Sequence, residues 1–448
     1  MTTPTELRAE ISALQELATD VVRRAKLAGA DQADVGLSVD QGLNINVRLG
    51  DVETIEHTLD RGLSLTVYVN QRKGSASSAD LSPKSIQDTL EQAIAIARHT
   101  ESDACHGLAD AARMAKHDPD LKLWFAHDLS PEAAIQLGKR CEAAGLNADP
   151  RITNSEGAGV SANQSYSVYA NSHGFVGVEA GTSYSVSASF VADAGDGLME
   201  RDYDYDAARD FAALKDAEAI GLRAAEKSLR RLKPRQLSTR TAKVLLTPEL
   251  TRGFVGHLTS AVSGGAQYRK SSFLLNAVGE KLLPDWCNWL ETPHLARAFG
   301  SANFDAEGVA TVNQSLIESG VLMRYVLGSY SARKLGLQST GNAGGLHNLT
   351  VSSNAGGQAE LMQAMGTGFW VTELMGQGVN GVTGDYSRGA AGFWVENGEI
   401  CYPVSEVTIA GNLRKMYQDL IAIGNDVDRR GSIHTGSSLL AAMTIAGS

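Results

Sequence analysis

The chain has 448 residues, of which 43% are hydrophobic and 20% are charged, and it carries a formal net charge of −11. This length predicts two or three domains, the composition is that of a globular protein, and no apolar run approaches the ~20 residues that span a bilayer. Because nucleic-acid-binding faces depend on Lys and Arg, the acidic excess argues against one. We therefore expect neither nucleic acid nor a membrane as a partner.

The N-terminus and the cysteines are typical of a cytoplasmic protein. The first twenty residues mix acidic and apolar side chains and lack the basic start and hydrophobic segment of a signal peptide. The four cysteines are scattered, with neither a CxxC pair nor the spacing of a zinc knuckle. We expect free thiols and a cytoplasmic location.

The first eighty residues predict a helix followed by antiparallel strands. Apolar residues recur at helical spacing over residues 6–29, and a glycine ends this stretch. Over residues 33–78 apolar and polar residues alternate, as in strands with one buried face. Glycines interrupt the alternation, and we expect hairpin loops at residues 40–42 and 49–51.

The middle of the chain predicts three helices and further strands. Ser82-Pro83 and Ser130-Pro131 each supply a capping hydroxyl and a first-turn proline, so each should begin a helix. The polar residues 101–120 between them are expected to be a connection. Alternation over residues 151–192 predicts a second sheet region, and residues 206–232 are expected to form a long helix.

A buried strand is expected to run directly into a helix near residue 243. The apolar residues 244–246 precede Thr247 and Pro248, an N-cap hydroxyl and a first-turn proline. Apolar residues then recur every four positions, and His257 lies beside this stripe. Beyond this helix glycine is dense over residues 341–398, and Asn397-Gly398 is a strong hairpin signal. The second half should therefore be mainly β.

These elements predict an α+β protein. N-terminal helices packed on antiparallel sheets should be followed by a mainly β C-terminal domain that contains one key helix. We expect an N-terminal α+β domain in two parts, residues 1–120 and 121–240, and a C-terminal domain over residues 241–448. Dinucleotide-binding, P-loop and serine-hydrolase motifs are missing from the sequence.

The helix after residue 247 lacks the residues of a zinc peptidase. Such a helix would carry two His ligands and a Glu that acts as general base on the metal-bound water. Here His257 stands alone, because Arg252 lies five residues before it and Gly253 follows. The simplest interpretation of His257 is a histidine packed or hydrogen-bonded in the interior.

Several segments resemble one known family over nearly the whole chain. They are GLSLTVYVNQRKGSAS, VLLTPELTRGFVGHL, STGNAGG and GFWVENGEICYPVSEVTIAGN. Together they resemble the TldD/PmbA family, formerly called modulators of DNA gyrase, and in particular its PmbA/TldE-type members. TldD-type members carry an HExxxH motif on the corresponding helix and a zinc-binding cysteine near the C-terminus. In this chain Arg252 and Gly253 replace the first His and the Glu, only His257 remains, and no cysteine follows Cys401.

The resemblance implies a non-catalytic subunit of a zinc metallopeptidase complex. A TldD-type partner would hold the zinc, and this chain would hold neither metal nor catalytic residues. The family's substrates are unfolded peptides such as antitoxins and microcin-type precursors. We expect pairing with a TldD-type subunit and a homodimer in its absence. Extended peptides could add to glycine-rich strand edges, and the expected peptide-groove residues are His257, Gly344, Gly345 and Asn354.

Two alternatives remain open at this point. One is an active metallopeptidase whose zinc ligands are rearranged and drawn from His257, His294, His347, Cys287 or His434. The other is a modulator that associates with DNA or gyrase, which only the older family name suggests.

Overall fold

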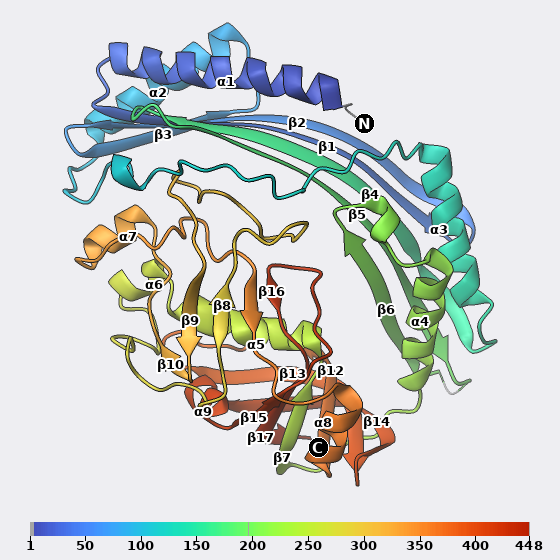
Figure 1. Ribbon diagram of the computed structural model, residues 1–448. Coiled ribbons are helices and arrows are strands. Elements are labelled where there is room, and N and C mark those ends of the chain that lie inside the picture. The colour runs from blue at the N-terminus through green and yellow to red at the C-terminus, as the bar shows by residue number, and fades with distance from the viewer. Residues whose placement is uncertain (1–3, 196, 448) are drawn as a thin grey trace.

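A six-stranded antiparallel sheet, here called the arch, bends over the C-terminal half of the chain (Figure 1). The computed structural model describes residues 4–195 and 197–447. The strand order of the arch is β3-β2-β1-β4-β5-β6. Its strands are β1 (Gln32–Arg48), β2 (Asp51–Val69), β3 (Arg72–Ser78), β4 (Ile152–Asn171), β5 (Val176–Asp193) and β6 (Met199–Ala208).

Helices cover the outer face of the arch at both of its ends (Figure 1). Along β1 every second residue except Gln41 is buried and apolar, as the alternation predicts. Leu37 packs in one core with α1 (Pro4–Leu27) and α2 (Pro83–His99). Ile45 packs in a second core with α3 (Pro131–Leu146) and α4 (Ala217–Arg230). Mostly polar and small residues occupy the inner face of the arch, which faces the C-terminal half (Figure 1).

Two local predictions for this half are wrong. The strands after residue 150 form no second sheet, because β4 pairs with β1 from Val35↔Ala170 to Val47↔Ala158 and so extends the first sheet. Residues 40–42 are not a loop but lie inside β1. A side chain at Gly42 would collide with Asn163 Oδ1 on β4 and come within 2.8 Å of Thr58 Oγ1 on β2, so this glycine provides space on the inner face. The turn at residues 49–51 is confirmed.

The helix predicted over residues 206–232 is shorter than expected. Residues up to Ala208 belong to β6, and α4 begins only at Ala217. Its start is set by Asp216, whose carboxylate accepts hydrogen bonds from the backbone N–H groups of Glu218 and Ala219. The helices expected after Ser82 and Ser130 are confirmed, and both serine hydroxyls accept a capping hydrogen bond.

Two smaller sheets and several short helices form the C-terminal half, which is mainly β as predicted (Figure 1). The first sheet has the order β14-β13-β12-β7-β17-β15, with β7 parallel to β12 and antiparallel to β17. Its strands are β7 (Arg240–Leu246), β12 (Gly368–Met375), β13 (Asp385–Glu396), β14 (Glu399–Asn412), β15 (Leu420–Ile423) and β17 (Ser438–Ala446). The second sheet, in the order β10-β9-β8-β11-β16, has β8 (Trp289–Glu291), β9 (Gln314–Glu318), β10 (Val321–Leu322), β11 (Leu349–Val351) and β16 (Ile433–His434). The helices are α5 (Pro248–Ala261), α6 (Gly264–Tyr268), α7 (Ser329–Lys334), α8 (Gln358–Met365) and α9 (Leu413–Gln418).

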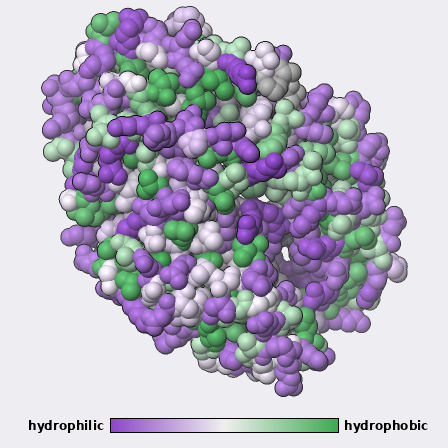
Figure 2. Space-filling model, in the orientation of Figure 1, coloured by the Kyte–Doolittle hydropathy of each residue, from purple (hydrophilic) through white to green (hydrophobic). Residues whose placement is uncertain are grey.

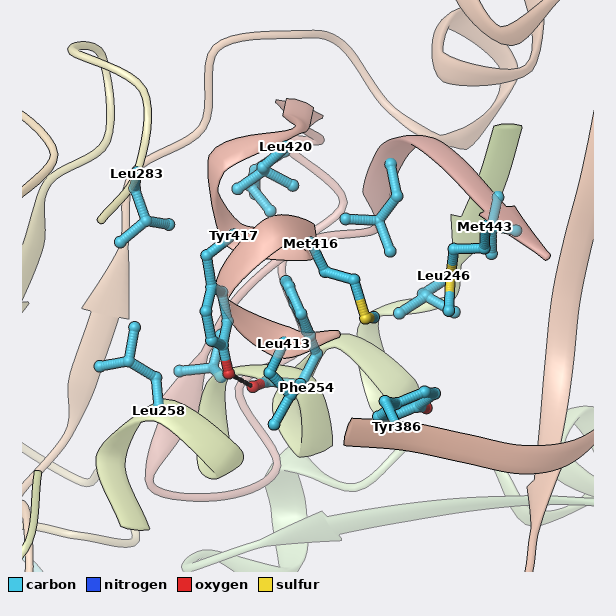
Figure 3. Close-up of a cluster of buried hydrophobic side chains, with 14 of the residues drawn as sticks. Leu246, Phe254, Leu258, Leu283, Tyr386, Leu413, Met416, Tyr417, Leu420 and Met443 are labelled. Carbon is cyan, nitrogen blue, oxygen red and sulfur yellow. Dashed lines mark hydrogen bonds between the residues drawn. The ribbon is translucent and has the colours of Figure 1, made fainter. Parts of the chain in front are cut away.

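The key helix α5 is anchored in the largest core of this half. Phe254 stacks on Tyr417 with 4.5 Å between ring centroids, and the Tyr417 hydroxyl donates to the Phe254 carbonyl oxygen at 2.8 Å (Figure 3). Thr247 stands at the predicted N-cap, but its hydroxyl makes no capping hydrogen bond. The hairpin at Asn397-Gly398 is confirmed, since both residues have positive φ and Glu396 pairs with Glu399.

None of the helices within residues 4–195 and 197–447 combines the length and the apolar composition that crossing a membrane requires.

Candidate functional site

The helix α5 belongs to the C-terminal half, and its Arg252 reaches from there to the arch. The Arg252 Nη2 atom is 3.2 Å from Asp428 Oδ2 in the C-terminal half and donates to Tyr205 Oη on β6 at 3.1 Å. Only 5% of the Asp428 side chain is exposed, so the ion pair is largely shielded from water. Arg252 is therefore a structural link between α5 and β6.

The neighbouring glycines leave one side of α5 bare. A Cβ atom placed on Gly253 or Gly256 would meet no atom within 4 Å. Gly253 is exposed, and no carboxylate stands at its position to act as a base. This side of the helix offers space for another chain but no reactive group.

His257 points to a cavity of its own. Together with Ser260, Phe273 and Arg388 it lines a space of about 300 Å³ in the C-terminal half. The imidazole lies edge-on to Tyr386, with 6.0 Å between ring centroids. Burial, and then the charge of Arg388, lower its pKa, which favours the neutral imidazole. Partial burial against an aromatic ring is what the simplest interpretation of this histidine predicted.

The other candidate zinc ligands have separate structural partners. His294 Nε2 is 3.1 Å from Thr311 Oγ1, and His434 Nε2 is 3.0 Å from the Gly431 carbonyl oxygen. Cys287 is fully buried, which raises the pKa of its thiol to about 12. Within the described residues, no three His, Cys, Asp or Glu side chains gather where they could hold a metal ion. The rearranged site is thus not supported by this arrangement.

A buried carboxylate, Glu291 at the end of β8, holds the segment that follows residue 339. Its Oε1 accepts hydrogen bonds from Asn342 Nδ2 at 2.7 Å and from the His347 backbone N–H at 2.7 Å, and lies 3.1 Å from His347 Nδ1. Its Oε2 lies 2.5 Å from Arg324 Nη2. Burial alone would raise the pKa of Glu291, but the hydrogen bond from His347 and the charge of Arg324 outweigh it and lower the pKa. Sequence reasoning missed this residue, because no local motif surrounds it.

Two adjoining cavities lie under the arch, between its inner face and the loops of the C-terminal half. The first, of about 820 Å³, reaches from β3 to β5 and is lined by Gly344 and Gly345. The second, of about 960 Å³, lies on the β5 side, where residues 118–124 run alongside. The residues that line both are Ser38, Ser167, Glu179, Gly300, Ala302 and His347. We call the two cavities together the channel.

The four residues expected to form a peptide groove do not share one cavity. Gly344 and Gly345 line the channel, with φ values of 97° and 128° that favour glycine. His257 lines the separate cavity described above. Asn354 lines neither, because its Oδ1 accepts the backbone N–H of Ile423 at 2.9 Å and so fixes the chain beside β15.

A third cavity, of about 600 Å³, separates β6 and α4 from the start of α5. Figure 2 shows the molecule hollowed between these elements and edged by hydrophilic residues. Arg430 lies over the Tyr205 ring at 4.2 Å and pairs with Glu249 at 2.7 Å and with Asp428 at 2.9 Å. Arg430, Glu249 and Asp428 are therefore engaged with one another.

Comparison with known proteins gives a consistent result over the length of the chain. Three family models match: PmbA/TldA metallopeptidase domain 1 over residues 33–97, the central domain over 126–232 and the C-terminal domain over 239–447. The chain is 46% identical to the metalloprotease PmbA of Escherichia coli O157:H7 over 442 residues, which covers 99% of this chain and 98% of that protein. It is 45% identical to a PmbA homologue of Haemophilus influenzae, with 98% of both covered.

Solved structures agree with this fold. The crystal structure of a "putative modulator of DNA gyrase" from Bacteroides thetaiotaomicron superposes with a TM-score of 0.92 and 29% identity, covering 100% of both chains. TldE from Thermococcus kodakarensis superposes with a TM-score of 0.85 over 96% of this chain and 100% of that one; at 20% identity, this likeness concerns the fold alone.

Proposed function

The chain belongs to the PmbA/TldD metallopeptidase family, and we propose that it acts there as a non-catalytic, PmbA/TldE-type subunit beside a zinc-bearing TldD-type partner. The observation that carries the proposal is that α5 has Arg252 and Gly253 where a zinc motif would have a histidine and a glutamate. Arg252, at the position of the first motif histidine, is engaged by Asp428, and Gly253 offers no base.

The residues present do not fit a zinc ion. A catalytic zinc site uses three protein ligands and leaves a position for the water that is activated. On α5 only His257 and Glu249 are of a ligand type, and Glu249 is paired with Arg430 at 2.7 Å. Arg388, which lines the cavity of His257, disfavours a nearby cation. No step of peptide hydrolysis is therefore assigned to a residue of this chain, and zinc is expected in the partner.

The role left to this chain is to hold the substrate. The channel under the arch has a wall of small polar residues, and the side of α5 at Gly253 and Gly256 carries no reactive group. Unfolded peptides, such as antitoxins or microcin-type precursors, are the proposed substrates, and the cytoplasm is the proposed location. Extended peptides suit such a surface because their backbone can hydrogen-bond to its serine hydroxyls and to backbone groups of the loops.

Pairing is part of this proposal. We expect a complex with a TldD-type subunit, and a two-fold homodimer when that subunit is missing, since a partner of the same fold can occupy the same surface. An obligate contact of this kind would bury on the order of 2,000 Å² or more.

The experiment mixes the purified chain with a TldD-type subunit and follows mass by light scattering and cleavage of an unstructured peptide. We expect a mass increase and a rise in cleavage over that of either subunit alone. The matched control is a TldD-type subunit whose HExxxH glutamate is changed to glutamine, which should form the same complex without cleavage. If mixing changes neither mass nor cleavage, the subunit role is refuted.

A further inference from the structure

We propose that Glu179 binds the cationic group of an extended peptide that lies in the channel, so that this chain selects peptides with a lysine or arginine side chain. The inference rests on the proposed function in so far as it takes the ligand to be a peptide. It goes beyond that function by naming the chemical class of the peptide and the residue that recognises it.

The position of Glu179 is the first support. It stands on the inner face of the arch and lines both cavities at the place where they adjoin, as does His347 from the opposite wall. A chain that passes through the channel must therefore pass this carboxylate.

The side chains beside Glu179 on the inner face of the arch are small, which leaves room for an extended peptide. Ser167 is the register partner of Glu179, Ser38 that of Ser167, and Gly62 that of Ser38. These residues form a row across β5, β4, β1 and β2 that contains no side chain larger than serine apart from the glutamate. A peptide can lie along this row and extend a long side chain to the carboxylate.

The nearest charged groups are bound elsewhere, so the Glu179 carboxylate is available to a ligand. Within the described part of the chain, no side chain lies at hydrogen-bond or ion-pair distance from the Glu179 carboxylate. Arg209 donates instead to the carbonyl oxygens of Thr182 at 3.2 Å and Phe299 at 2.9 Å. His347 is engaged by Glu291. A second channel acid, Asp305, is already saturated, because it accepts backbone N–H groups from Ala343, Glu307 and Val309.

The Glu179 side chain is exposed to the channel, and the walls around it remove only part of its water, which favours a cationic ligand. The surrounding protein raises the pKa of Glu179, although the charges of His347 and Arg209 partly oppose this effect. A carboxylate that has lost part of its water gains most from a charged donor that replaces that water. Asp40, which lines the same cavity on the neighbouring row, adds negative charge. The exposed cations Arg8, Arg61 and Lys122 also line the channel, but among the described residues none of them forms an ion pair with Glu179.

The test compares two fluorescently labelled ten-residue peptides of glycine and serine, one with a central lysine and one with glutamine there. Binding to the full chain is followed by anisotropy. Because a hydrogen bond to a charged group contributes about 1.5–3 kcal/mol, we expect at least about tenfold tighter binding of the lysine peptide. Glu179→Gln should reduce this preference to within about twofold. Glu318→Gln, a change at an exposed residue of β9, should leave it intact.

Circular dichroism and the thermal midpoint establish that each variant is folded. Equal binding of both peptides by the wild type, no binding of the lysine peptide at millimolar concentration, or an unchanged preference in folded Glu179→Gln overturns the proposal. Failure of the proposed function is seen separately, because it would abolish the gain of cleavage on mixing with a TldD-type subunit and leave the ratio of the two binding constants unchanged.

Discussion

Arg252 and Asp428 form an ion pair, 3.2 Å between Nη2 and Oδ2, at the position where the family resemblance places the first histidine of a zinc motif. Arg430 also holds Asp428, at 2.9 Å, so the carboxylate is shared by two guanidinium groups. Burial alone would raise the pKa of Asp428, but the hydrogen bonds from Arg430 and the charge of Arg252 lower it. These ion pairs join α5 to the loop that carries Asp428 and Arg430, and a guanidinium group thus stands at the position of that histidine.

Replacing Arg252 should weaken the fold and leave the chemistry unaffected. Arg252→Met removes one partner of a carboxylate that is only 5% exposed, while Arg430 remains, so we expect a loss of about 1–2 kcal/mol. The midpoint of thermal unfolding measures the effect. Lys84→Met, at an exposed position of α2, is the matched control and should shift the midpoint little. An unchanged midpoint in Arg252→Met would show that the ion pair contributes nothing.

Asp34 on the inner face of the arch should make stability depend on pH near neutrality. Burial raises the pKa of Asp34 to about 7, with Lys73 opposing and Glu307 adding to the rise. In the unfolded chain its pKa is about 3.9, so ionisation destabilises the folded state fully above pH ~7, and the effect disappears below pH ~4. Asp34→Asn should therefore stabilise the protein at pH 8 by roughly 1 kcal/mol or more, and by less as the pH falls.

Thermal midpoints at several pH values between 4 and 8 test this sign. Asp88→Asn, which removes an exposed carboxylate from α2, should give a difference from the wild type that stays nearly constant with pH. A destabilised Asp34→Asn at pH 8 would be evidence that the carboxylate is ionised and well paired in the folded protein.

Glu291 should control the order of the segment that carries Gly344 and Gly345. Glu291→Gln removes the charge that faces Arg324 at 2.5 Å and His347 at 3.1 Å, and breaking a buried pair costs about 3–5 kcal/mol. Hydrogen exchange of the backbone amides over residues 342–347 should then accelerate. Glu318→Gln, on the same sheet but exposed, should leave these amides as protected as in the wild type. Unchanged protection in Glu291→Gln would assign the order of the segment to its backbone turns alone.

The sequence predicted regular features with a strong local signal and missed those that depend on distant partners. The alternation along β1 and the serine caps of α2 and α3 are local, and these elements appear as expected. Gly42 was interpreted as a loop signal, yet it lies in mid-strand, because the inner face of the arch brings Thr58 close to it. That crowding depends on the register between β1 and β2, which a local pattern does not contain.

In the candidate site, too, the features with a local sequence signal could be predicted and those that depend on distant partners could not. The loss of the zinc motif could be predicted at Arg252 and Gly253, since the missing side chains are visible in the sequence itself. The partner of Arg252 lies 176 positions later, and Glu291 precedes the histidine that it holds by 56 positions. The role proposed for Glu179 depends on a cavity that forms only where the arch meets the loops around Gly300. These relationships are set by tertiary packing, and no spacing in the chain indicates them.

Zinc content is the most direct test of a non-catalytic subunit. The purified chain, dialysed against zinc and then against metal-free buffer, is analysed by plasma mass spectrometry beside a TldD-type subunit treated in the same way. We predict close to one zinc per TldD-type chain and a negligible amount in this chain, because Arg252 and Gly253 replace a ligand and the base. Close to one chelator-sensitive zinc per copy of this chain, with peptide cleavage that the chelator stops, would contradict the account.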